Sequence, residues 1–124
     1  MSTASRHQQL EQILKNFVSS TAEVEGAAVV SLDGLPLYSA LPAGTEENRV
    51  AAMAAALLAL GERSLRELAR GHLEQVYVKG SEGYVVVLQA GADAVLEVMT
   101  SPQAKLGLVL LEAGRCAQEV GRLL

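Results

Sequence analysis

Few residues in this 124-residue sequence have the types and spacing that catalysis or metal binding requires. The two histidines, His7 and His72, are far apart, and neither has a histidine or cysteine at the spacing typical of zinc ligands. Cys116 is the sole cysteine and has no histidine near it in sequence, so we expect a half-buried helix residue rather than a nucleophile. Asp33 precedes Gly34, and such a pair is typical of a tight turn.

No dinucleotide-binding, Walker or nucleophile-elbow sequence is present either. Without a nucleophile, a base and a group that orients the base, we expect no catalytic residues, no metal, no cofactor and no enzyme activity. The remaining candidates are Arg63, Arg66 and Arg70, which recur at helical spacing and could dock an acidic partner. Glu62 and Glu67 offset the positive charge of these arginines, so the favoured interpretation is an ordinary solvated surface.

The composition limits the class of protein. A net charge of −4 and a pI of about 5.1 do not favour binding to nucleic acid or to an anionic membrane. The most apolar run, 50–60, is shorter than the ~20 residues that span a bilayer, and the polar N-terminus lacks a signal-peptide core. The single cysteine allows no intramolecular disulfide. We therefore expect one cytoplasmic domain over residues 1–124.

The elements that would position any site follow from apolar periodicity and turn residues. Ser5 and Gln8 form a capping box, Thr45 is a suitable N-cap, and Gly71 is a suitable C-cap. Pro36 cannot donate to a ladder, so its strand should be short or at an edge. We expect helices over 5–20 and 45–70 and from the Ser101-Pro102 pair to the C-terminus, and strands over 26–32, 35–39, 72–79, 84–88 and 94–100.

The helix over 45–70 has apolar residues on more than one face. On a helical wheel one broad face should pack on the sheet, while the opposite face of the first half is made of alanines. Alanine is the best helix former and can face water at little cost, so the alanine face could be plain surface. Alternatively, its small side chains could let a second chain approach closely. The expected sheet face is Val50, Met53, Ala54, Leu57, Leu58, Gly61, Leu65 and Leu68, and the expected dimer contact is Ala52, Ala55, Ala56 and Ala59.

Three glycines recur every seventh residue in the last helix. Gly107, Gly114 and Gly121 fall beside its apolar stripe, although an interior helix glycine costs about 0.5–1 kcal/mol relative to alanine. Our hypothesis is that this glycine line lets the first helix lie close on the same side of the sheet. The alternative is that the glycines are tolerated without a packing role.

These features together resemble the Roadblock family of dynein-light-chain-like proteins. The resemblance rests on the segments 26–36 (GAAVVSLDGLP), 80–86 (GSEGYVV) and 104–107 (AKLG), on the alanine-rich helix, and on the order α-β-β-α-β-β-β-α. It covers nearly the whole chain, and the nearest type within the family is the bacterial MglB-like regulators. The resemblance implies an α/β sandwich, in which a five-stranded antiparallel-type sheet carries two helices on one face and the helix 45–70 on the other.

The resemblance also implies a function. Roadblock proteins dimerise through the equivalents of helix 45–70 and strand 72–79, which places Val76, Tyr77 and Val78 at the dimer interface. Many pair with Ras-like small GTPases, as regulators, GTPase-activating partners or scaffolds. The expected function is therefore a homodimeric, non-enzymatic regulator or scaffold for a Ras-like small GTPase. A small-molecule sensor with an internal polar cavity, or a light-chain-type adaptor with no GTPase partner, stays open as the alternative.

Overall fold

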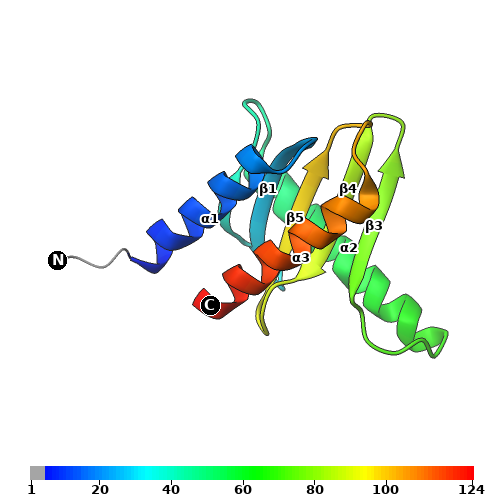
Figure 1. Cartoon of the computed structure of the whole chain (residues 1–124). Coiled ribbons are helices and arrows are strands. Elements are labelled where there is room, and N and C mark those ends of the chain that lie inside the picture. Colours follow the sequence, from blue (N-terminus) through cyan, green and yellow to red (C-terminus); the bar gives the residue numbers. More distant parts are fainter. Residues whose placement is uncertain (1–4) are drawn as a thin grey trace.

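The computed structural model describes residues 5–124, which form a five-stranded antiparallel sheet with helices on both faces (Figure 1). The strands lie in the order β2-β1-β5-β4-β3, so β2 and β3 are the two edges. Helices α1 and α3 lie side by side on one face, and α2 crosses the other (Figure 1). The elements are α1 (Arg6–Ser20), β1 (Val24–Ser31), β2 (Pro36–Ala40), α2 (Glu47–Glu67), β3 (Gln75–Gly80), β4 (Gly83–Gln89), β5 (Ala94–Thr100) and α3 (Leu106–Leu123). The predicted element order and fold class are confirmed.

Local sequence signals explain the first three elements. Ser5 Oγ accepts a hydrogen bond from the Gln8 amide at 3.1 Å, and Gln8 Oε1 accepts one from the Ser5 amide at 3.0 Å, so the predicted capping box opens α1. The β1–β2 turn contains Gly34 at φ 91°, as the Asp-Gly pair predicted. Pro36 lies in edge strand β2, as predicted. Its nitrogen has no proton to donate, and at the edge of the sheet this costs the central strands no hydrogen bond.

The predicted caps of α2 are wrong. The residue at the N-cap is Glu46 rather than Thr45, and its side chain makes no capping hydrogen bond. At the other end Ala69, not Gly71, is the first residue with positive φ, at 53°. The Arg70 amide donates to the carbonyl of Leu65 at 2.9 Å, which closes a Schellman-type end around Ala69. The helix therefore ends four residues before Gly71.

The start of α3 also differs from the prediction. Ser101 and Pro102 lie in a turn, and the helix begins at Leu106 with Lys105 at its N-cap. Ser101 has another role, because its Oγ donates to the carboxylate of Glu23 and accepts from the Gln103 amide at 3.2 Å. Ser101 therefore ties the end of β5 to Glu23, the residue before β1, instead of opening a helix.

Two apolar cores lie on the two faces of the sheet. The larger core joins α1 and α3 to the sheet and includes Leu14 of α1, Val29 of β1 and Leu96 of β5, all fully buried. The smaller core lies under α2 and contains Ala28, Val30, Val50, Ala51, Ala54, Leu58, Val87 and Val95. Strand β5 is therefore the central strand, with apolar neighbours on both of its faces.

The glycine line of α3 does not face α1, so that hypothesis is wrong. A Cβ added at Gly107 or Gly114 would meet no atom within 4 Å, because both face open space. A Cβ at Gly121 would lie 2.8 Å from the backbone nitrogen of Gly91, in the turn between β4 and β5. Only Gly121 is needed for a close approach, and the approach is to a turn rather than to a helix.

Two alanine substitutions in α3 should therefore change stability in opposite directions. We expect Gly114→Ala to raise the free energy of unfolding by about 0.5–1 kcal/mol, because the helix gains propensity without a clash. We expect Gly121→Ala to lower it by about 1–3 kcal/mol, because the new methyl group overlaps backbone that cannot easily move. Urea unfolding of both variants measures the difference, and equal shifts would contradict this account of α3.

Candidate protein interface

Helix α2 packs on the sheet through a different face from the one predicted. Val50, Ala51, Ala54 and Leu58 are buried against the sheet, whereas Met53 is 55% exposed. The predicted placement of Met53 on the sheet is wrong, because α2 is turned so that the small side chain of Ala51 packs there instead. Leu68 was also placed on the sheet face; it lies past the last helical residue and is 68% exposed.

The outer face of α2 is more apolar than the sequence analysis expected. Ala52, Ala56 and Ala59 are exposed and Ala55 is half-buried. Between these alanines and the sheet, Met53 and Leu60 also reach solvent, and Leu60 is 64% exposed. We name Met53, Ala56 and Leu60 the α2 stripe; their spacing of three and four residues places them on one side of the helix. Sequence reasoning missed Met53 and Leu60, although this spacing was visible in the sequence.

Edge strand β3 brings further apolar residues to the same side of the sheet. Val76 pairs with Val87, which lies in the core under α2, so Val76 and Val78 point to the α2 face. Val78 is 48% exposed. Tyr77 points to the other face, where its ring lies 6.4 Å from that of Tyr84. The predicted interface residues of β3 are therefore divided between the two faces of the sheet.

Helix α2 and strand β3 lie in direct contact. A Cβ added at Gly61 would lie 2.5 Å from Cγ2 of Val76, so only a glycine allows this approach. Beyond Val76, the pairing of Val78 with Val85 and of Val85 with Met99 forms a row across β3, β4 and β5. These three side chains keep exposed surface and belong to neither core; we name them the uncovered row. The α2 stripe and the uncovered row share one face of the molecule.

The three arginines continue from the outer face of α2. Arg63 and Arg66 are exposed, and within residues 5–124 no ion pair holds either of them. Arg70 lies beyond the helix, where its Nη1 donates to the Ala69 carbonyl at 3.4 Å. The positions of Arg63 and Arg66 follow Ala59 at helical spacing, so the apolar surface of α2 adjoins a charged end that carries these two arginines together with Glu62 and Glu67.

The residues considered for chemistry are placed apart from one another. The ring of His7 contacts that of Tyr38 edge-on at 4.9 Å, and Asp33 Oδ1 accepts a hydrogen bond from Ser31 Oγ at 2.5 Å inside the turn. Burial, and then the charge of Glu119, raise the pKa of the Cys116 thiol to about 12, so the thiol stays protonated. Across residues 5–124, no group of three or more His, Cys, Asp or Glu side chains could hold a metal ion.

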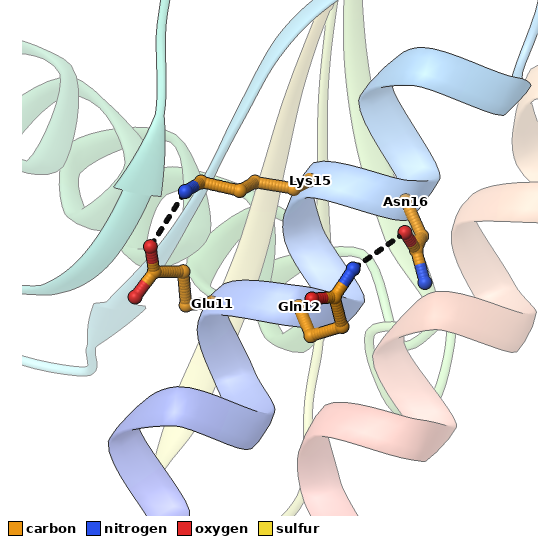
Figure 2. Close-up of polar contacts among 4 residues, drawn as sticks. All are labelled: Glu11, Gln12, Lys15 and Asn16. Carbon is orange, nitrogen blue, oxygen red and sulfur yellow. Dashed lines mark hydrogen bonds and ion pairs between the residues drawn. The ribbon is translucent and has the colours of Figure 1, made fainter.

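A groove of about 230 Å³ lies between α1 and α3, and several of its polar side chains are paired along their own helices. Figure 2 shows Gln12 donating to Asn16 at 2.8 Å, and beside them Lys15 Nζ donating to Glu11 at 2.6 Å. On the α3 side, Arg115 is paired with Glu112 at 3.1 Å. The paired groups bond along their own helices and do not converge on a common point, whereas the polar groups of a ligand site do converge. Within the described range, no helix is long and apolar enough to cross a membrane.

Among residues 5–124, a buried carboxyl oxygen of Glu97 has no hydrogen-bond partner. Glu97 lies on β5, faces α2 and is 3% exposed. Its Oε1 is buried and accepts no hydrogen bond from any residue between 5 and 124. Burial raises the pKa of this carboxyl from 4.5 to about 7, because the charged form loses its hydration. Sequence reasoning missed Glu97, since a single acid within a strand gives no sign of its burial.

This architecture defines a small α/β sandwich domain in which a single helix leaves part of one sheet face uncovered. The chain belongs to the Roadblock/LC7 domain family, whose family model matches residues 10–100. A relative in Methanocaldococcus jannaschii, the uncharacterized protein MJ1340, is 33% identical over 103 residues, which are 83% of this chain and 90% of the relative. The family indicated by the sequence resemblance is confirmed.

Solved structures share the whole architecture. The Roadblock/LC7 domain from Streptomyces avermitilis is 22% identical and superposes with a TM-score of 0.83, covering 89% of this chain and 92% of that domain. A structure of MglB with a tetrameric arrangement is 19% identical and gives a TM-score of 0.87, covering 99% of this chain and 93% of that one. At these identities the similarity establishes the fold.

Proposed function

We propose that this protein is a non-enzymatic, cytoplasmic homodimer that regulates or scaffolds a Ras-like small GTPase. The observation that carries the proposal is the apolar surface formed by the α2 stripe and the uncovered row, next to an unpaired edge strand. Exposed apolar surface of this kind, and an unpaired strand edge, both favour association with another chain.

A second copy of the chain can use both features at once. Two β3 strands related by a two-fold axis pair antiparallel, which would extend the sheet across both subunits. The same axis would bring the two α2 stripes together, and the small side chain of Ala56 would allow a close approach. The pairing of Val78 with its own copy would cover the exposed end of the uncovered row.

The GTPase partner is supported by family membership and by three arginines, at the end of α2 and just beyond it, that are not held in ion pairs within residues 5–124. The resemblance to MglB-like Roadblock proteins implies a Ras-like GTPase partner, and the MglB structure with a tetrameric arrangement shares this fold. Arg63, Arg66 and Arg70 carry no ion pair among the residues described, so they are free to meet an acidic surface. The dispersed histidines, the turn role of Asp33 and the protonated thiol of Cys116 support the absence of enzyme activity.

Capture on the tagged protein tests the proposal. Lysate of the source cells is passed over the wild-type chain with either GDP or a non-hydrolysable GTP analogue, and retained proteins are identified by mass spectrometry. We expect a Ras-like GTPase whose recovery depends on the nucleotide, and we expect Arg66→Glu to lower its recovery at least about tenfold, because a repulsive charge replaces an attractive one.

The matched control is Arg122→Glu, an exposed arginine in the last turn of α3 and far from α2. This variant should retain the GTPase as the wild type does. Recovery of partners that are not GTPases would instead favour a light-chain-type adaptor. Equal recovery by all three proteins would exclude α2 as the contact surface.

A further inference from the structure

Glu97 stands out because no residue in the described range 5–124 stabilises a negative charge on its side chain. It occupies the middle of β5, the central strand, and is 3% exposed. Its neighbours across the sheet are Ala28 on β1 and Val87 on β4. Along β5, the residues on the same face are Val95 and Met99. A carboxylate in such a setting is costly unless it is paired, so Glu97 is expected to favour its neutral form.

No titratable group faces Glu97 from the elements packed around it. The residues that α2 buries against the sheet are apolar, and so are those that β1 and β3 present on this face. Strand β4 presents Val85, Val87 and Gln89, and Gln89 is exposed and carries no titratable group. The charged residues of α2 are all exposed, and none of them is among its buried residues. They are Glu47, Arg49, Glu62, Arg63, Arg66 and Glu67, preceded by Glu46 at the N-cap.

The uncovered row lies directly beside Glu97. Glu97 pairs with Val87, and two residues along the same strands Met99 pairs with Val85, on the same face of the sheet. Val85 and Met99 are half-buried, so water still reaches the face next to the carboxyl group. A second copy that covers the α2 stripe and this row would remove that water.

We propose that self-association of this protein takes up protons through Glu97, so that the dimer tightens as the pH falls. The inference rests on the proposed homodimer and adds a regulatory property to it. Glu97 would thus make the quaternary state of the protein respond to pH near neutrality.

The direction follows from linkage. Burial in the single chain already raises the pKa of Glu97 from 4.5 to about 7. Covering the uncovered row raises the pKa further, so the dimer binds more protons than two separate chains between the two pKa values. Association is then strongest below the pKa of the separate chain and weakens as the pH rises through it. If the second copy placed a cation next to Glu97, the charged carboxylate would be favoured instead. The dimer would then weaken as the pH falls.

Sedimentation velocity of the full chain at about pH 6 and about pH 8.5 tests the proposal, with Glu97→Gln as the matched variant. If the pKa of Glu97 is one unit higher in the dimer than in the separate chain, each of the two subunits changes the dissociation constant about tenfold. We expect the wild-type Kd to be at least about tenfold lower at the acidic pH, and the Kd of Glu97→Gln to change much less. A pH titration of the wild-type Glu97 carboxyl ¹³C signal needs no variant, and its midpoint should move up with protein concentration.

Each outcome decides one of the two proposals. A dimer whose Kd is the same at both pH values, or which weakens on acidification, overturns the proton linkage and leaves the dimer standing. A midpoint that does not change with concentration, in a sample shown to dimerise, also overturns it. A wild-type chain that stays monomeric at both pH values overturns the proposed homodimer itself.

Discussion

A glutamate at position 60 is expected to convert the proposed dimer into a monomer. Leu60 is 64% exposed in the single chain, so Leu60→Glu removes no core contact and the subunit should fold as before. In a two-fold dimer the substitution would place two unpaired carboxylates in the apolar contact between the α2 stripes. We expect Kd to rise at least about a hundredfold, which corresponds to roughly 2.7 kcal/mol. Sedimentation velocity at micromolar concentration measures the change, and Ala56→Glu should act in the same way.

The control for this prediction is an equally apolar position outside the proposed contact. Leu111 is half-exposed on α3, on the opposite side of the sheet from α2. Leu111→Glu should therefore sediment as the wild type does, and circular dichroism should show that both variants are folded. If the Leu60→Glu protein remains a dimer at the wild-type concentration, the α2 stripe is not part of the interface.

Gly83→Ala is expected to give the largest loss of stability among the glycine substitutions considered. Gly83 opens β4 at φ 142°, a conformation that residues with a Cβ rarely adopt. A Cβ there would also lie 1.9 Å from the carbonyl oxygen of Thr100, which is backbone and cannot move aside. The neighbouring amide of Tyr84 donates to Thr100 Oγ1 at 3.0 Å, and this contact would be displaced as well. We expect a loss of at least about 3 kcal/mol, measured by urea unfolding.

Gly80→Ala is the matched control in the same turn. Gly80 pairs with Gly83, and a Cβ at Gly80 would reach only the Gly83 carbonyl oxygen, at 3.4 Å. We expect its unfolding free energy to lie within about 0.5 kcal/mol of the wild-type value. If Gly83→Ala were as stable as Gly80→Ala, the close contact between β4 and Thr100 would be refuted.

The turn between β3 and β4 also fixes the position of β3. A substitution that disorders β3 should therefore weaken self-association as well.

Much of the fold was predictable because its signals are local. The capping box of Ser5 and Gln8, the Asp-Gly turn and the apolar strands around it depend on neighbouring residues, and these predictions are confirmed. The element order also followed from such signals. The caps were less predictable, because Ser101 is suited to an N-cap but bonds instead to Glu23, which is distant in sequence.

The candidate interface was predictable only in part. The alanines of α2 and the apolar strand β3 were identified from their composition, and whether they form a dimer interface stays a prediction. Met53 and Leu60 were missed because the rotation of α2 about its axis depends on which side chains fit the sheet below it. Ala51 fits there, so the larger Met53 faces outward.

The sequence by itself therefore determined the family, the order of the elements and the presence of a helix with more than one apolar face. These properties follow from periodicity and from residues close together in the chain. Only the tertiary structure decided which face of α2 stays open, that Gly121 rather than Gly114 is closely packed, and that Glu97 is buried without a partner among residues 5–124. Each of these depends on contacts between residues far apart in sequence, and periodicity carries no information about such contacts.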